Sequence, residues 1–154
     1  MLQEKQTAPA FNARNQDNQL VSLADYAGKK IVVLYFYPKD DTPGCTIEAN
    51  QFTELASEFA ANDSTVIGVS KDACDSHRAF IDKYGLKLDL LADTDGDICE
   101  QYNVWQEKEK NGVKKMGIVR STFVINKQGI LEMASYNVRP DGHAQDVLNM
   151  IKEL

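Results

Sequence analysis

One of the three cysteines in this sequence follows residues that place it at the start of a helix. Cys45 comes directly after Thr42-Pro43-Gly44, behind an apolar run that ends at Pro38. Threonine is a good N-cap residue, and proline suits the first helical position because its missing N–H costs nothing there. The sequence therefore predicts a helix that begins after Thr42, with Cys45 as its third residue. The unpaired N–H groups and the dipole of a first turn favour negative charge, and so would favour a thiolate at Cys45.

The same spacing is also consistent with a structural role for Cys45. The cysteine continues an apolar stripe at +4 and +3 spacings, made of Ala49, Phe52, Ala56 and Phe59. Free cysteine is among the most buried residue types. Periodicity alone therefore leaves two interpretations open, a small core residue and a nucleophile.

The other cysteines and the two histidines give weaker signals. Cys74 follows Asp72, the expected cap of a later helix, and would be partly exposed, whereas Cys99 is expected to pack in a short helix. Three cysteines are too few and too uneven for a disulfide framework. The spacing from Cys74 to His77 occurs in half of some zinc sites, but no second pair follows, so no metal site is expected. His77 and His143 are both expected on helix surfaces.

The composition limits the partners and the location. Net charge is 17 − 23 = −6, and no basic cluster is larger than Lys114-Lys115, so a nucleic-acid partner is not expected. No stretch approaches the ~20 apolar residues needed to span a bilayer, and no membrane association is expected. The first residues lack the apolar core of a secretion signal, which favours a cytoplasmic location. The length predicts a single domain over residues 1–154.

The elements that would position Cys45 alternate between strands and helices. Strands are expected at 31–37, 65–69, 88–92, 121–125 and 130–136, with an N-terminal hairpin within 11–23. Helices are expected at 43–61, from a cap at 72 to 84, at 98–102 and at 144–154, with a surface loop at 107–117. This order predicts an α/β fold of thioredoxin-like outline: a mixed central β-sheet flanked by helices, preceded by an N-terminal β-hairpin.

The residues around Cys45 resemble those of a known family. The run Pro38-x-x-x-Thr42-x-x-Cys45 matches the Pro-x-x-x-Thr/Ser-x-x-Cys signature of peroxiredoxins, the AhpC/TSA-like proteins. The fuller text, Tyr-Pro-Lys-Asp-Asp-Thr-Pro-Gly-Cys-Thr-Ile-Glu-Ala, is similar to the peroxiredoxin Q branch, also called bacterioferritin comigratory protein. The segments 102–105 and 117–125 resemble that branch as well, the second through its Arg-Ser-Thr-Phe strand.

The resemblance implies a thiol-dependent peroxidase that reduces hydrogen peroxide and organic hydroperoxides without a cofactor. It implies that Cys45 attacks the O–O bond and becomes a sulfenic acid. Thr42 would hydrogen-bond the peroxide oxygens, and Pro38 would shield the sulfur from water. Arg120 would keep the thiolate ionised and stabilise charge on the departing oxygen, and Glu48 would orient Arg120.

The resemblance leaves the return of Cys45 to its reduced form open. Chains of this branch often carry a resolving cysteine five residues after the reactive one, or in the next helix. Asn50 and, approximately, Ile81 occupy those positions here. We therefore expect a one-cysteine cycle completed by an external thiol, with thioredoxin as the family's usual donor and a monomer as the usual state. Resolution by Cys74 is the alternative.

Other functions on a thioredoxin-like scaffold have weaker support. A thioredoxin-type thiol oxidoreductase would need Cys-x-x-Cys, and Glu48 occupies the second cysteine's position. A cysteine hydrolase would need a histidine base near Cys45, which neither histidine-bearing segment is expected to provide. A binding or chaperone module would tolerate an ordinary thiol at Cys45.

Overall fold

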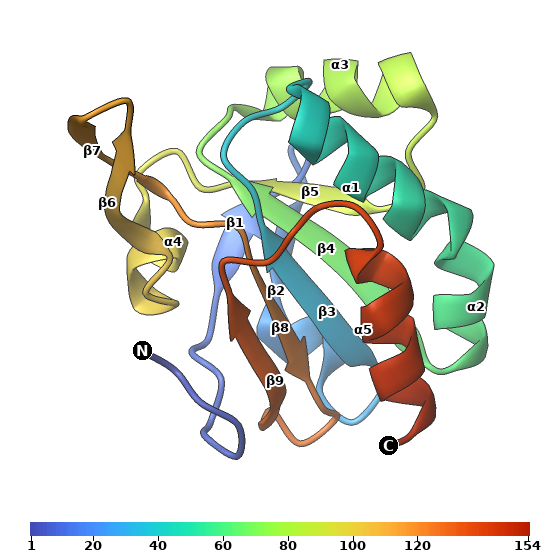
Figure 1. The fold of residues 1–154 in the computed structure, drawn as a ribbon. Coiled ribbons are helices and arrows are strands. Elements are labelled where there is room, and N and C mark those ends of the chain that lie inside the picture. Colours follow the sequence, from blue (N-terminus) through green and yellow to red (C-terminus); the bar gives the residue numbers. More distant parts are fainter.

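A seven-stranded sheet with parallel and antiparallel pairs forms the centre of the computed structural model, which describes residues 1–154 (Figure 1). The strand order is β2-β1-β5-β4-β3-β8-β9. The strands are β1 (Asn12–Arg14), β2 (Leu20–Ser22), β3 (Ile31–Phe36), β4 (Ser64–Ser70), β5 (Asp89–Ala92), β8 (Ser121–Ile125) and β9 (Leu131–Tyr136). The helices are α1 (Pro43–Glu54), α2 (Ala56–Ala61), α3 (Cys74–Tyr84), α4 (Asp97–Gln101) and α5 (His143–Lys152), with a 3₁₀ turn η1 (Leu23–Tyr26). The predicted mixed sheet, flanking helices and N-terminal hairpin are confirmed.

Strand β3 is an interior strand of the sheet, and the loop that follows it leads to Cys45. It pairs parallel with β4 and antiparallel with β8. Its β-branched and aromatic side chains suit a pleated surface that is covered on both faces. Because successive side chains of a strand point to opposite faces, β3 contributes to two separate cores.

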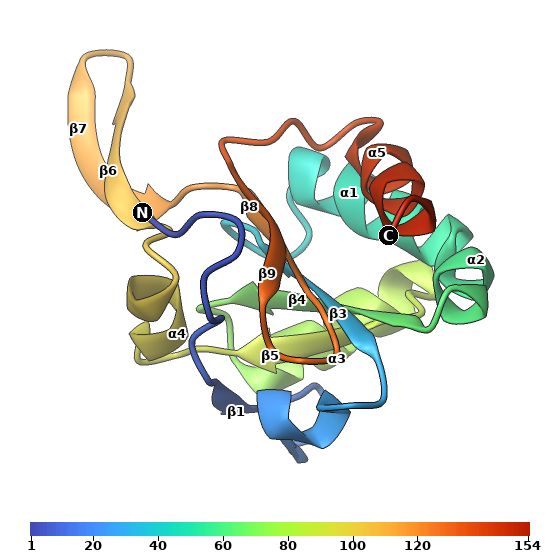
Figure 2. The ribbon, with the colours of Figure 1, turned by 90° about the horizontal axis from the view of Figure 1, so that it is seen from below.

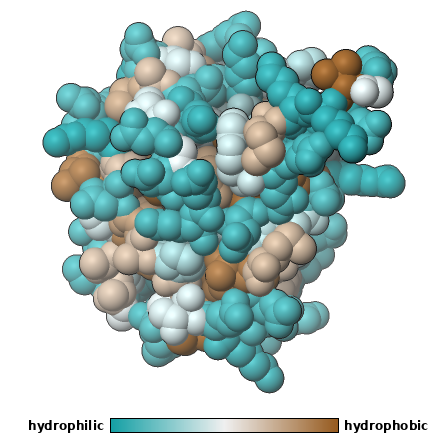
Figure 3. All heavy atoms as spheres, turned by 90° about the vertical axis from the view of Figure 1, so that its left-hand side faces the viewer, coloured by the Kyte–Doolittle hydropathy of each residue, from teal (hydrophilic) through white to brown (hydrophobic).

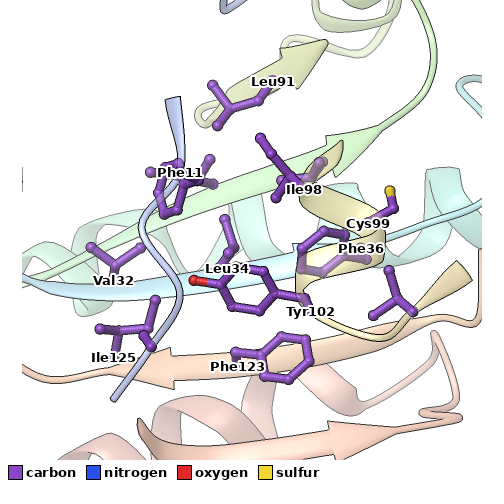
Figure 4. Packing of buried hydrophobic residues seen from close by; sticks show 14 of the residues in the cluster. Phe11, Val32, Leu34, Phe36, Leu91, Ile98, Cys99, Tyr102, Phe123 and Ile125 are labelled. Carbon is purple, nitrogen blue, oxygen red and sulfur yellow. The ribbon is translucent and has the colours of Figure 1, made fainter. Parts of the chain in front are cut away.

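The two cores lie on opposite faces of the sheet. Val32, Leu34 and Phe36 pack beneath α4 with Tyr102 and Phe123, as Figure 4 shows. The alternate residues of β3, including Val33 and Tyr35, pack against α1, α3 and α5. Cys45 belongs to this second core, so α1 is fixed to the sheet by the same face that carries the thiol.

The long helix expected over 43–61 is in fact two helices. The chain leaves helical geometry at Leu55, with φ −99° and ψ 6°, and α2 begins at the next residue. The apolar stripe continues across the break, which is why the periodicity does not reveal it.

The cap expected for the next helix is also wrong. Ala73, and not Asp72, occupies the N-cap position of α3, and the side chain of Asp72 accepts a hydrogen bond from Ser70 Oγ at 2.7 Å.

The expected surface loop at 107–117 is instead a β-hairpin. Its strands β6 (Trp105–Lys110) and β7 (Val113–Ile118) pair antiparallel and stand out from the rest of the molecule in Figures 1 and 2. Polar side chains on both faces hide the alternation that would normally indicate strands. The two-residue turn Asn111-Gly112, with φ 55° and 78°, is the signal that indicates a hairpin here.

The face drawn in Figure 3 is largely hydrophilic, with small separate hydrophobic areas. No helix in the structure combines the length and the hydropathy needed to cross a membrane.

Candidate active site

The first turn of α1 places Cys45 as the spacing predicts. Thr42 is the N-cap residue in an extended conformation, Pro43 is the first helical residue, and the Thr42 carbonyl accepts a hydrogen bond from Thr46 N at 2.9 Å. The Thr42 hydroxyl does not cap the helix. It donates instead to the Lys39 carbonyl oxygen at 2.8 Å, so its lone pairs stay free to accept a hydrogen from a ligand.

An arginine at the start of β8, the strand next to β3, reaches the sulfur of Cys45. Arg120 stands just before β8, and its Nη2 donates to Cys45 Sγ at 3.4 Å. Its Nη1 donates to Glu48 Oε1 at 2.8 Å. Cys45 is only 2% exposed. The structure thus brings Cys45, Glu48 and Arg120 together, 75 residues apart in sequence at the widest.

Glu48 is a fully buried carboxyl with one oxygen unpaired. Its Oε2 has no hydrogen-bond partner, and the side chain is 0% exposed. Burial raises the pKa of Glu48 to about 7, although the charge and hydrogen bond of Arg120 act in the opposite direction. A carboxyl with this pKa changes its charge near neutral pH, and so changes the electrostatic environment of Arg120.

Gly44 allows the arginine to come this close. A Cβ atom on Gly44 would lie 3.0 Å from Arg120 Nη2 and 3.4 Å from Pro140 Cγ. Since Glu48 and Cys45 already hold the guanidinium from two sides, it has little freedom to move away. A glycine at position 44 is therefore explained by the space that the Arg120 side chain needs, and not only by its place in the first turn of a helix.

Three other predicted residues lie outside this arrangement. Pro38 follows β3 with an exposed side chain, and its shielding of the sulfur stays a prediction. Cys74 is the first residue of α3 and is partly exposed, whereas Cys99 is fully buried in the core beneath α4. Burial, with the neighbouring Asp93 carboxyl, raises the pKa of the Cys99 thiol, which suits a packing role. All three thiols are free.

Both histidines were expected on helix surfaces, and both expectations are wrong. His77 is 0% exposed, with Nδ1 2.8 Å from Asp40 Oδ2 and Nε2 2.9 Å from the Leu91 carbonyl oxygen. His143 is buried at the start of α5, with Nε2 2.8 Å from Thr122 Oγ1. Their polar partners lie on other elements of the fold, which helical spacing cannot reveal.

The sequence reasoning also missed a lysine near the site. Lys108 of the β6–β7 hairpin folds over Gly117 and donates from Nζ to the Ile118 carbonyl at 2.9 Å. Burial and the charge of Arg120 lower the pKa of Lys108, while the charge of Cys45 raises it. The hairpin thus brings a second cation into range of the Cys45 site.

Comparison with known proteins identifies the family to which this buried thiol and its paired arginine belong. Residues 5–134 match the AhpC/TSA family. A putative peroxiredoxin bcp of Helicobacter pylori J99 is 47% identical over 150 residues, covering 97% of this chain and 98% of the relative. Peroxiredoxin Bcp of Escherichia coli K12 is 37% identical, covering 95% and 93%. The chain belongs to the AhpC/TSA family and is a peroxiredoxin, an enzyme of the thiol peroxidase class.

Similar solved structures show to which branch of the family the chain belongs. Xylella fastidiosa PrxQ superposes with a TM-score of 0.93 at 34% identity, covering 99% of this chain and 97% of that one. Xanthomonas campestris peroxiredoxin Q gives a TM-score of 0.88 at 36% identity, covering 93% and 90%. Within its family the chain is a member of the peroxiredoxin Q/Bcp branch, as the sequence resemblance predicts. A non-catalytic binding or chaperone role is not favoured.

Proposed function

We propose that Cys45 is the residue that attacks the peroxide. The observation that carries this is the sulfur's position in the first turn of α1, with Arg120 Nη2 3.4 Å away. Both the helix start and the guanidinium stabilise a thiolate, which is the nucleophilic form of cysteine. Arg120 in turn is held by Glu48 at 2.8 Å, so its charge is fixed before a substrate arrives.

The first step transfers one oxygen from the peroxide to the sulfur. The Cys45 thiolate attacks the terminal oxygen of ROOH, the O–O bond breaks, and its electron pair leaves on the RO oxygen. That oxygen takes up a proton and departs as ROH, and the sulfur is left as a sulfenic acid. Arg120 stabilises the charge that develops on the departing oxygen.

Thr42 has a more definite role than the sequence could assign. Because its hydroxyl hydrogen is donated to the Lys39 carbonyl, its oxygen is oriented to accept the O–H of the bound peroxide. We propose that this contact turns the terminal oxygen towards Cys45. Pro38, two residues after the end of β3, lies in the same loop and would limit access of water to the sulfur.

We propose that an external thiol completes the cycle. It attacks the sulfenic sulfur and releases water, and a second thiol then reduces the mixed disulfide, so two thiols together supply the two electrons. Thioredoxin is the reductant we expect. Cys74 is the alternative partner: it is partly exposed in the first turn of α3, and its use would require local rearrangement at Cys45, which is buried.

The peroxide substrate, the cellular location and the oligomeric state of the protein complete the proposed function. The Xanthomonas campestris bacterioferritin comigratory protein is described as having alkyl peroxide reduction activity, and we propose that this chain reduces alkyl hydroperoxides as well as hydrogen peroxide. We further propose a cytoplasmic monomer in which residues 1–154 act as one domain.

Mass spectrometry of the protein after treatment with peroxide tests the recycling step. The one-cysteine cycle predicts sulfenic acid at Cys45, trapped by dimedone, and no internal disulfide. A Cys45–Cys74 linkage, absent from Cys74→Ser and unchanged in Cys99→Ser, would show that Cys74 resolves the sulfenic acid instead.

A further inference from the structure

A group of buried polar side chains joins the loop before Cys45 to helix α3, and the mechanism above does not use it. Asp40, 8% exposed, lies in this loop between Pro38 and Thr42. Its carboxylate accepts from Tyr37 Oη at 2.6 Å, and from Ser76 Oγ at 2.7 Å. His77 Nδ1 lies 2.8 Å from the same carboxylate. Three donors therefore converge on one buried carboxylate in the loop.

His77 connects this carboxylate to the sheet. Its second ring nitrogen, Nε2, lies 2.9 Å from the carbonyl oxygen of Leu91 in β5. Each ring nitrogen of His77 thus lies within hydrogen-bond distance of an oxygen, the Asp40 carboxylate on one side and the Leu91 carbonyl on the other, so the ring bridges the loop and β5. Burial alone would raise the pKa of the Asp40 carboxyl, but its hydrogen bonds and the charge beside it lower that pKa below its ordinary value.

The backbone of the loop is held from the same side. Asp40 N donates at 2.8 Å to Asp72 Oδ2, which also accepts from Ser70 Oγ at the end of β4. Figure 1 shows this loop lying beside α3, where the chain passes from β3 to α1. The carbonyl of Lys39, next to Asp40, is the group that orients the Thr42 hydroxyl. The position of the loop thus decides where Thr42 stands relative to Cys45.

We propose that the Asp40–His77 pair is a positioning device for peroxide attack, holding the loop that carries Thr42 at the geometry that oxidation of Cys45 requires. The inference rests on the proposed function of Cys45 and Thr42. It assigns His77 and Asp40 as positioning residues, because they reach the peroxide only through Thr42. Recycling by an external thiol does not use Thr42, so loss of the pair slows oxidation without slowing reduction of the sulfenic acid.

Two substitutions of His77 separate positioning from simple support of the fold. In His77→Asn the amide nitrogen occupies about the place of Nδ1 and keeps a donor towards Asp40. In His77→Gln it occupies about the place of Nε2 and keeps only the contact with Leu91. Each variant removes the ring and one of its two contacts, so the two variants are expected to destabilise the fold similarly. A role limited to stability would affect both alike.

A neighbouring ion pair offers a matched control. Asp41 joins the same loop to the same helix through Lys83 Nζ at 2.7 Å, but its side chain is 40% exposed and that of Lys83 is 58% exposed. Exposed pairs contribute little, so Asp41→Asn is expected to leave both half-reactions unchanged.

The experiment follows the two half-reactions separately in the full chain. Cys45 oxidation by hydrogen peroxide is measured in single turnover by rapid quench and alkylation, and reduction of preoxidised protein is measured with dithiothreitol. We expect oxidation to fall roughly tenfold or more in His77→Gln and Asp40→Ala, to stay within about threefold of wild type in His77→Asn, and reduction to be unslowed. Equal oxidation rates in the Asn and Gln variants, or parallel losses in both half-reactions, would overturn the proposal. Cys45→Ser tests the proposed function separately, since it alone removes the oxidisable sulfur.

Discussion

The buried carboxyl of Glu48 makes the stability of the protein depend on pH in a way that can be worked out from the structure. Burial raises the pKa of Glu48 from its ordinary value of 4.5 to about 7. Between these two values the folded protein keeps a proton on Glu48 that the unfolded chain has lost. Stability therefore falls as the pH rises through this window, because the folded state binds more protons.

The magnitude follows from the same two values. Their difference, at about 1.4 kcal/mol for each pH unit, corresponds to about 3 kcal/mol lost between pH 4.5 and pH values above 7. Glu48→Gln removes the titration but keeps an amide oxygen that can accept from Arg120, so the variant is expected to fold with the site in place.

The assay is equilibrium unfolding by urea of wild type and Glu48→Gln at several pH values from 4.5 to 8. We expect the variant's stability relative to wild type to rise by up to about 3 kcal/mol across this range. Glu54→Gln, an exposed position on the same helix, should show no such trend. A difference between Glu48→Gln and wild type that does not change with pH would refute the reasoning.

Three further substitutions test the geometry around the sulfur, each through the second-order rate of Cys45 oxidation. Arg120→Lys is expected to reduce it roughly 10²-fold, because a lysine lacks the planar fork whose two nitrogens reach Glu48 and Cys45 separately, and a near-normal rate would show that the fork is not needed. Thr42→Val keeps the shape but not the acceptor, and should also cost about 10²-fold; an unchanged rate would show that the hydroxyl does not bind the peroxide. Gly44→Ala should displace the guanidinium and slow oxidation several-fold with little loss of fold, and an unaffected rate would mean that Arg120 tolerates the added methyl group.

Local signals made the start of α1 predictable from the sequence. An N-cap threonine, a proline at the first helical position and the length of the preceding apolar run all act within a few residues, so Cys45 could be placed correctly. The mixed sheet followed from the order of strands and helices. The β6–β7 hairpin was missed because its alternation is masked by polar side chains on both faces, although Asn111-Gly112 indicates it.

The contacts that complete the site join residues distant in sequence. His77 and Asp40 are 37 residues apart, and Arg120 and Glu48 are 72 apart. No spacing within one sequence shows that these side chains meet. Arg120 and Glu48 were predicted as site residues only through the family resemblance. The burial of His77 was not predicted, because the oxygens that it contacts lie in a loop and on β5.

The most direct test of the central assignment is a single-turnover measurement on the three cysteine variants without any reductant. We predict that wild type, Cys74→Ser and Cys99→Ser each consume one equivalent of hydrogen peroxide at similar rates and gain one oxygen at Cys45. We predict that Cys45→Ser consumes none. Rapid peroxide consumption by Cys45→Ser, or its loss in Cys74→Ser or Cys99→Ser, would contradict the assignment of Cys45 as the reactive residue.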